Sequence, residues 1–174
     1  MLRGAGIGLE YRMLGRTGEK IAAIGLGTWG IGGGMMPNYS ADKQAIEAIR
    51  HAVKLGMNHI DTAEIYGGGH AEELVGEAIK EFARDDIFVA SKVWHTNLRY
   101  DDVLKACERS LKRLQTSYID LYYIHWPNPS IPLSETMRAL ERLYDEGKIR
   151  YIGVSNFPQA SSRRRDHACH TRIL

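Results

Sequence analysis

Ionisable side chains stand at the ends of three successive apolar segments of the sequence. Asp61 ends one segment, and Tyr66 follows it in a glycine-rich loop. Lys92 ends the next segment, and His125 ends the one after that. If these segments are parallel strands, their carboxyl ends meet at one face, where α/β enzymes build their active sites. A carboxylate, a phenol, an ammonium and an imidazole at one place can move a proton and stabilise developing charge.

Each of these residues also has an ordinary structural explanation. An aspartate after a strand is often a helix cap, a tyrosine anchors a loop, a lysine is solvated and a histidine packs in a core. The occurrence of such residues at the ends of consecutive segments favours a shared functional site over independent structural roles.

The spacing of apolar residues predicts the elements that position these side chains. Residues 9–24 alternate in polarity around a turn and predict a short β-hairpin. An apolar run follows at residues 25–29, and Ser40 is the predicted N-cap of a helix that Gly56 ends. Strands are then predicted at residues 59–63, 87–90, 118–126 and 149–154, with amphipathic helices between them. Strands of continuous apolar character, each followed by a helix, indicate the α/β class with a parallel sheet.

The composition indicates one folded domain. The chain has 174 residues, of which 44% are hydrophobic and 25% charged, which excludes a disordered or low-complexity protein. No apolar run approaches the ~18 residues that span a bilayer. The apolar stretch at the start of the sequence is too short for a signal peptide. We therefore expect no membrane partner. The presence of two cysteines argues against a disulfide framework and favours a reducing, cytoplasmic location.

The sequence changes character at Pro158. The chain carries 23 basic and 21 acidic residues, and residues 158–174 hold four Arg and one Asp, so the remainder has 19 basic and 20 acidic residues. We expect an N-terminal extension at residues 1–8 and a folded region at residues 9–157. Residues 158–174 are expected to form a basic tail, either disordered or read in a shifted frame.

Motifs for other functions are weaker. Residues 25–30 match G-x-G-x-x-G, but no helix can begin until about residue 40, and Asp61 lies 36 positions beyond Gly25, so the dinucleotide fold built on that motif is disfavoured. The basic run at residues 163–165 lacks interleaved aromatic residues, so we expect no nucleic-acid partner. His, Cys and His at positions 167, 169 and 170 lack the spacing of a structural zinc site, and no metal is expected.

A series of longer motifs resembles the aldo-keto reductase family. They are LGRTG, IGLGTW, HIDTAEIYG, ASKVW, DLYYIHWP and GKIRYIGVSNF, and together they cover about residues 10 to 157. The resemblance implies a TIM-type (β/α)8 barrel that uses NADPH to reduce an aldehyde or ketone to an alcohol. It also implies that the chain supplies an incomplete barrel of about five strand–helix units, preceded by the hairpin.

By this resemblance, Asp61, Tyr66, Lys92 and His125 form a catalytic tetrad in which Tyr66 protonates the carbonyl oxygen. A free phenol has a pKa of about 10, which is too high for efficient proton transfer at neutral pH. An ammonium ~4 Å away, at an effective dielectric constant of ~20, contributes ~4 kcal/mol in favour of the phenolate. Lys92 would supply that ammonium, held in place by Asp61, and His125 would orient the carbonyl oxygen.

The resemblance assigns further residues to cofactor and substrate. The implied cofactor contacts, for NADPH with NADH as the alternative, are Gly27, Thr28, Trp29, Asp61, Ser155 and Asn156. The implied substrate contacts are Trp94, His125 and Trp126, and the two indoles have core packing as their alternative role.

The resemblance leaves the activity of this chain open. A full barrel has eight strands and about 250 residues, and later strands of the family carry much of the cofactor site. Activity in this shorter chain is one expectation, and a non-catalytic NADPH-sensing or protein-interaction module is the alternative. Five strands also leave open barrel edges, which predict self-association.

Overall fold

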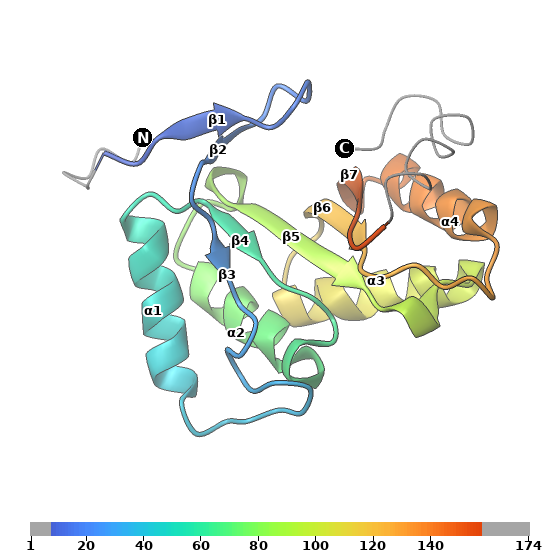
Figure 1. Cartoon of the computed structure of the whole chain (residues 1–174). Helices are drawn as coiled ribbons and strands as arrows, with labels where there is room; N and C mark the ends of the chain where they lie inside the picture. Colours follow the sequence, from blue (N-terminus) through green and yellow to red (C-terminus); the bar gives the residue numbers. More distant parts are fainter. Residues whose placement is uncertain (1–7, 158–174) are drawn as a thin grey trace.

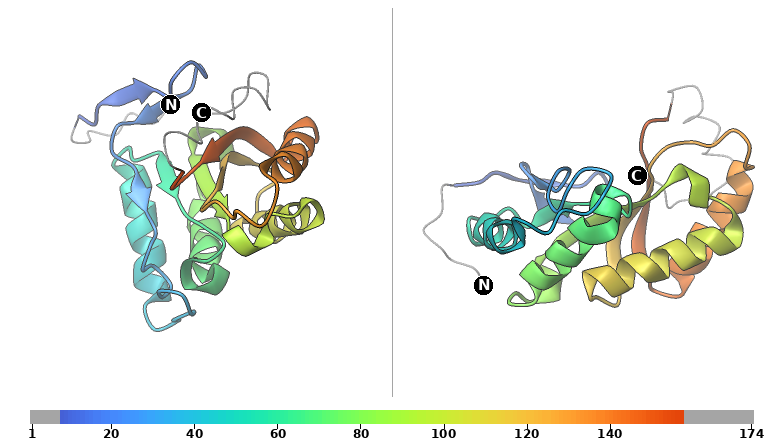
Figure 2. Two further views of the ribbon diagram at one scale, coloured as in Figure 1. Left: turned by 45° about the vertical axis from the view of Figure 1, so that its right-hand side comes forward. Right: turned by 90° about the horizontal axis from the view of Figure 1, so that it is seen from below.

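A computed structural model describes residues 8–157 of the chain. Its centre is a parallel sheet of five strands in the order β3-β4-β5-β6-β7. The strands are β3 (Leu26–Gly27), β4 (His59–Asp61), β5 (Phe88–Val93), β6 (Ile119–Ile124) and β7 (Ile149–Val154). The helices between them are α1 (Asp42–Lys54), α2 (His70–Ile79), α3 (Tyr100–Leu114) and α4 (Leu133–Asp145). The helices cover one face of the sheet, as Figures 1 and 2 show, and the predicted α/β architecture is confirmed.

The hairpin of β1 (Tyr11–Met13) and β2 (Lys20–Ala22) is antiparallel and lies near the beginnings of the strands (Figure 1). Its residues Leu14 and Ile21 pack on a small cluster of Phe88, Ala90 and Leu121, on the face of the sheet away from the helices. The hairpin therefore covers the amino-terminal end of this inner face and leaves the carboxyl ends of the strands to form a site.

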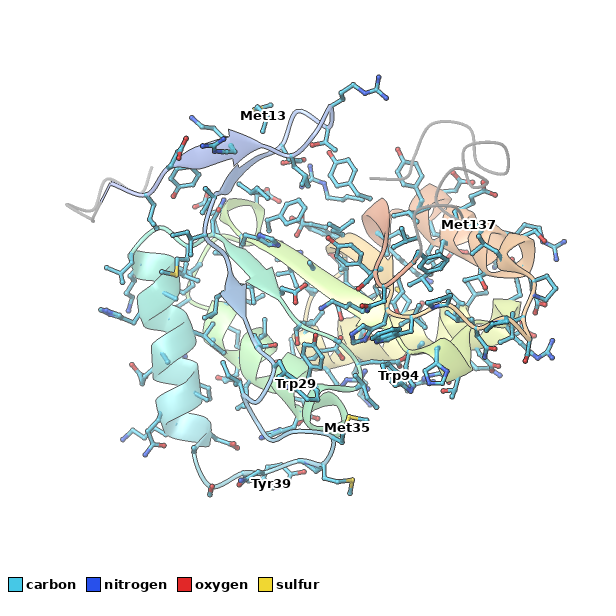
Figure 3. The ribbon with its side chains drawn as sticks, in the orientation of Figure 1. Met13, Trp29, Met35, Tyr39, Trp94 and Met137 are labelled. Atoms are coloured by element: carbon cyan, nitrogen blue, oxygen red, sulfur yellow. The ribbon has the colours of Figure 1, made fainter. Side chains whose placement is uncertain are left out.

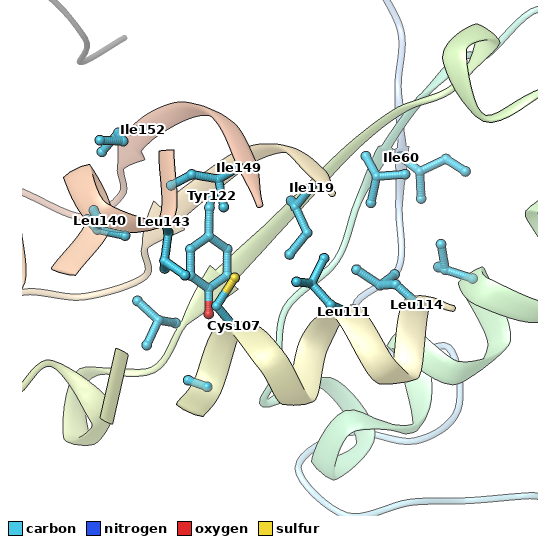
Figure 4. Packing of buried hydrophobic residues seen from close by; sticks show 14 of the residues in the cluster. Ile60, Cys107, Leu111, Leu114, Ile119, Tyr122, Leu140, Leu143, Ile149 and Ile152 are labelled. Atoms are coloured by element: carbon cyan, nitrogen blue, oxygen red, sulfur yellow. The ribbon is translucent and has the colours of Figure 1, made fainter. Parts of the chain in front are cut away.

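The larger core lies between the sheet and the helices. In Figure 4, Tyr122 of β6 stands beside Cys107 of α3, near Leu143 of α4. Burial raises the pKa of the Cys107 thiol to about 12, so this cysteine remains protonated and packs as a small apolar side chain. The alternation of β5 directs Val89, Ser91 and Val93 toward the helices and leaves Lys92 on the inner face.

The start of α1 differs from the prediction. The sequence predicts Ser40 as the N-cap, but the capping position belongs to Ala41, which makes no side-chain capping bond. The backbone N–H of Ser40 instead donates to the Asn38 side-chain oxygen, because the chain enters the helix through a local turn at Asn38. The other end agrees with the prediction: Gly56 follows α1 with a φ of 99°, a conformation that glycine adopts readily.

A buried ion pair joins α2, α3 and β5 behind the inner face. Glu72 of α2 is fully buried, and its carboxylate accepts hydrogen bonds from the Ser91 hydroxyl at 2.5 Å and from the Arg113 Nε at 2.7 Å. Burial raises the pKa of Glu72, while Arg113 and Ser91 oppose that rise. Because Ser91 precedes Lys92, this pair fixes the strand that carries the lysine.

We predict that Arg113→Met lowers the free energy of unfolding by about 3–5 kcal/mol, because it leaves the Glu72 carboxylate buried without its ionic partner. Arg142→Met is the matched control: its partner Glu146 lies at the surface, so the loss is at most about 1 kcal/mol. Urea denaturation of both variants measures the difference. Equal losses would contradict a special role for the buried pair.

Candidate active site

The ammonium of Lys92 is the centre of the site. Lys92 is 6% exposed, and its Nζ donates to the Asp61 carboxylate at 2.7 Å, to the Thr62 carbonyl at 2.8 Å and to the Tyr66 hydroxyl at 3.3 Å. The pairing of Asp61 with Ala90 in the parallel β4–β5 ladder brings the two strand ends to this place. The structure thus joins three of the predicted site residues through a single charged group.

Glycines after Tyr66 fix the position of its phenol. Tyr66 begins a 3-10 turn (Tyr66–Gly69), and the next two residues, Gly67 and Gly68, have φ of 58° and 62°. A Cβ on Gly67 would lie 2.5 Å from the Gly32 carbonyl oxygen, so only glycine fits there. The Gly67 N–H also donates to the Gly34 carbonyl at 2.6 Å, which fastens the turn to the loop after β3.

His125 follows β6 and lies beside the phenol. Its ring centroid is 5.7 Å from that of Tyr66 and 5.2 Å from that of Trp94, both in edge-on contacts. Burial, and then the charge of Lys92, lower the pKa of His125 to about 4. Its Nδ1 is buried and has no hydrogen-bond partner within residues 8–157. The imidazole is therefore neutral at pH 7, and its ring can donate one hydrogen bond without carrying charge.

Aromatic rings border the phenol and the imidazole. Trp29, after β3, lies 4.9 Å from the Tyr66 ring and is 58% exposed, so one side of it faces solvent. Figure 3 shows Trp29 and Trp94 at the carboxyl ends of the strands, far from Met13 in the hairpin. Trp126 is 45% exposed and makes no ring contact with another aromatic residue of the described region. The structure thus gathers two of the three tryptophans around the tetrad.

The predicted cofactor residues occupy the two sides of this group. Gly27 ends β3, and a Cβ placed on it would meet no atom within 4 Å. Thr28 is fully buried, and its N–H donates to the Asp61 carbonyl at 2.9 Å. After β7, the Asn156 side-chain amide donates to the His125 carbonyl and to the Ser155 hydroxyl, both at 2.9 Å.

These groups fit a nicotinamide. Asn156 is exposed, and its side-chain oxygen has no partner among residues 8–157, so it can accept from the NH2 of a carboxamide. The Ser155 hydroxyl can donate to the carbonyl oxygen of the same carboxamide.

Within the described residues no cluster of His, Cys, Asp and Glu suits a metal ion, and the motif at positions 167–170 lies outside them. Among residues 8–157, the structure contains no helix with both the length and the apolar character of a membrane span.

Two contributors escaped the sequence prediction. The Thr62 carbonyl accepts from Lys92, and such backbone roles leave no mark in residue type. The Glu64 carboxylate accepts from the Trp94 backbone N–H at 2.6 Å. The only sequence signal for Glu64 was an acidic residue placed between Asp61 and Tyr66.

The two buried histidines of this region predict opposite pH responses. Burial lowers the pKa of His70, but its hydrogen bonds to Glu73 and Asp42 outweigh burial and leave the pKa raised above 6.5. We predict that an NMR titration of the ring protons places His125 near pH 4 and His70 above 6.5.

Stability follows from the same shifts. The unfolded chain protonates His125 near pH 6.5 and the folded chain near pH 4, so this residue reduces stability as the pH falls between those values. The His70 contribution is full below 6.5 and is lost as the pH rises through its raised pKa. A His125 midpoint near 6.5 would contradict the enclosed, neutral imidazole.

Comparison with known proteins agrees with this geometry. Residues 23–169 match the model of the Aldo/keto reductase family. The chain is 48% identical over 158 residues to aldo-keto reductase YhdN of Bacillus subtilis, covering 86% of this chain and 47% of YhdN. It is 40% identical over 153 residues to methylglyoxal reductase YeaE of Escherichia coli, covering 87% of this chain and 52% of YeaE.

Solved structures agree as well. The thermostable aldo-keto reductase Tm1743, solved with the inhibitor epalrestat, superposes with a TM-score of 0.93 at 55% identity, covering 95% of this chain and 61% of Tm1743. An aldo/keto reductase of Klebsiella pneumoniae, solved with NADP and acetate, superposes with a TM-score of 0.78 at 42% identity. The match covers 84% of this chain and 50% of the Klebsiella chain. The chain spans about half the length of the curated relatives it matches, and its sheet is part of a (β/α)8-type barrel. By these matches the chain belongs to the aldo/keto reductase family.

Proposed function

We propose that the site reduces an aldehyde or ketone to an alcohol with NADPH. The observation that carries this proposal is the contact of the Lys92 ammonium with both the Asp61 carboxylate and the Tyr66 hydroxyl. In this position the ammonium can stabilise the negative charge that remains on the Tyr66 oxygen after the hydroxyl has given its proton to a substrate.

The residues divide the work of carbonyl reduction. When NADPH is bound, its nicotinamide supplies the hydride that reaches the carbonyl carbon. Tyr66 gives its hydroxyl proton to the carbonyl oxygen, which completes the alcohol. Lys92 stabilises the phenolate that results, and Asp61 holds the lysine. The neutral ring of His125 donates a hydrogen bond to the carbonyl oxygen and so orients it.

Residues on both sides of the tetrad are proposed to hold the cofactor. Ser155 and Asn156 bind the carboxamide of the nicotinamide, and Gly27, Thr28 and Trp29 border it with Asp61. The Klebsiella pneumoniae relatives solved with NADP and with NADPH support this cofactor over NADH.

The substrate is proposed to be a small carbonyl compound bordered by Trp29, Trp94 and Trp126. Relatives are named methylglyoxal reductase and glyoxal reductase, which supports small aldehydes as a substrate class.

We also propose that copies of the chain associate through their sheet edges. In the described sheet, β3 pairs only with β4, and β7 pairs only with β6, so each edge leaves backbone groups for another strand.

We predict that the purified chain binds NADPH saturably, with quenching of tryptophan fluorescence because Trp29 borders the site. Tyr66→Phe should retain this binding and lose about 10²–10⁴-fold in kcat for aldehyde reduction, the usual contribution of a positioned proton donor. Absorbance at the NADPH band measures turnover. Size-exclusion chromatography of the same sample tests association, and a monomer would contradict the proposed edge pairing.

Tyr39→Phe is the control, because it removes an exposed hydroxyl of the loop that precedes α1 and should leave kcat unchanged. Binding without turnover by the unaltered chain would favour the sensing module over the reductase. An unchanged kcat in Tyr66→Phe would refute Tyr66 as the proton donor.

A further inference from the structure

The carboxylate of Glu64 joins two loops of the site. Glu64 lies in the segment between Asp61 and Tyr66, and its backbone N–H donates to the Lys92 carbonyl at 3.3 Å. Its side chain, 7% exposed, reaches across to the loop after β5. Glu64 thus lies between the tetrad and the segment that carries Trp94, and its carboxylate hydrogen-bonds to none of the four tetrad side chains.

The contacts of this carboxylate hold a short turn in place. Its Oε1 accepts from the Trp94 N–H at 2.6 Å and from the Asn97 side-chain amide at 3.0 Å, so it grips the two ends of the segment Trp94–Asn97. That segment contains the 3-10 turn η3 (His95–Asn97), which has no side-chain cap of its own. The remaining oxygen, Oε2, lies 3.5 Å from the guanidinium of Arg109.

The turn determines where the indole of Trp94 points. The Trp94 N–H follows the last residue of β5, so the neighbouring strand does not bond it, and the Glu64 carboxylate takes that place. The Glu64 side chain is 7% exposed, so little water competes for the acceptor oxygen that this N–H meets. On the other side of the turn, the Asn128 side-chain amide donates to the His95 carbonyl at 2.9 Å. These bonds hold the backbone of the turn at both sides, and from it the indole of Trp94 meets the ring of His125 edge-on at 5.2 Å.

We propose that Glu64 is a positioning residue that holds Trp94 against His125 and so sets the wall of the carbonyl pocket. This assignment rests on the proposed reductase function for its consequence, but the contact it describes exists without cofactor or substrate. This contact requires an acceptor oxygen at the distance from the backbone that a glutamate side chain provides. Negative charge is secondary, because Arg109 is half exposed and only loosely paired with Glu64.

The test uses a chain in which Trp94 is the one remaining tryptophan, made by Trp29→Phe and Trp126→Phe. Glu64→Gln keeps both the length and the acceptor oxygen, so its Trp94 emission and its acrylamide quenching should match those of the parent. Glu64→Asp keeps the charge but is one methylene shorter. It should shift the emission to the red and increase quenching, as should Glu64→Ala.

Glu135→Ala is the matched control. The Glu135 carboxylate likewise accepts from a backbone N–H, that of Tyr100 at 3.0 Å at the start of α3. This substitution should lower the unfolding temperature about as much as Glu64→Ala and leave Trp94 emission unchanged. If Glu64→Ala does not fold, the Gln and Asp variants decide the matter between them.

Two results would overturn the proposal. One is a folded Glu64→Asp variant whose Trp94 emission equals that of the parent, and the other is a Glu64→Gln variant shifted as far as Glu64→Asp. Both readings are taken without NADPH, so they stand whether or not the chain reduces carbonyls. In a chain that does turn over, Glu64→Asp should raise KM for a small aldehyde more than it lowers kcat.

Discussion

The enclosed ammonium of Lys92 is the constraint on which the site depends. A charge that is 6% exposed must be matched by acceptors, because an unpaired buried charge is strongly unfavourable. Three acceptors meet it, and they come from the end of β4, from the residue after it and from the first turn beyond the loop. All three acceptors must lie around the ammonium at once, and the β4–β5 register and the glycines after Tyr66 position them there. The same contacts that compensate for burial of the lysine place its ammonium beside the Tyr66 hydroxyl.

The sheet separates this site from a second set of charges. Behind β5, Glu72 and Arg113 form an ion pair that is bonded to Ser91, and it lies on the helix side of the same strand that carries Lys92 on its inner side. At the strand beginnings, Asp120 accepts from Arg84 and Arg150, and Arg150 also pairs with Glu19 of the hairpin. These groups are all matched within the fold, whereas the groups at the carboxyl ends keep unmatched atoms. Sites for ligands are expected where such polar atoms remain.

Much of this arrangement could be predicted from the sequence, because local patterns encode it. Apolar strands alternating with amphipathic helices gave the parallel sheet, and the polar residues at strand ends gave Asp61, Lys92 and His125 a common location. Contacts between distant segments could not be predicted that way. The hydrogen bond between Glu64 and the Trp94 N–H joins residues 30 positions apart in the sequence. The start of α1 depends on a turn at Asn38 rather than on Ser40. Trp126 illustrates the same limit, since its residue type suits a pocket wall but does not predict that its indole makes no ring contact with another aromatic residue of the described region.

The most direct test of this account is the exchange of lysine ammonium protons with water, observed by NMR on a chain with isotope-labelled lysine side chains. Lys92 is enclosed by three acceptors, so one ammonium signal should exchange far more slowly than the rest. That signal should vanish in Lys92→Met and should exchange faster in Asp61→Asn. If every lysine ammonium exchanges rapidly, or if the slow signal survives in Lys92→Met, Lys92 is not enclosed and the proposed centre of the site is wrong.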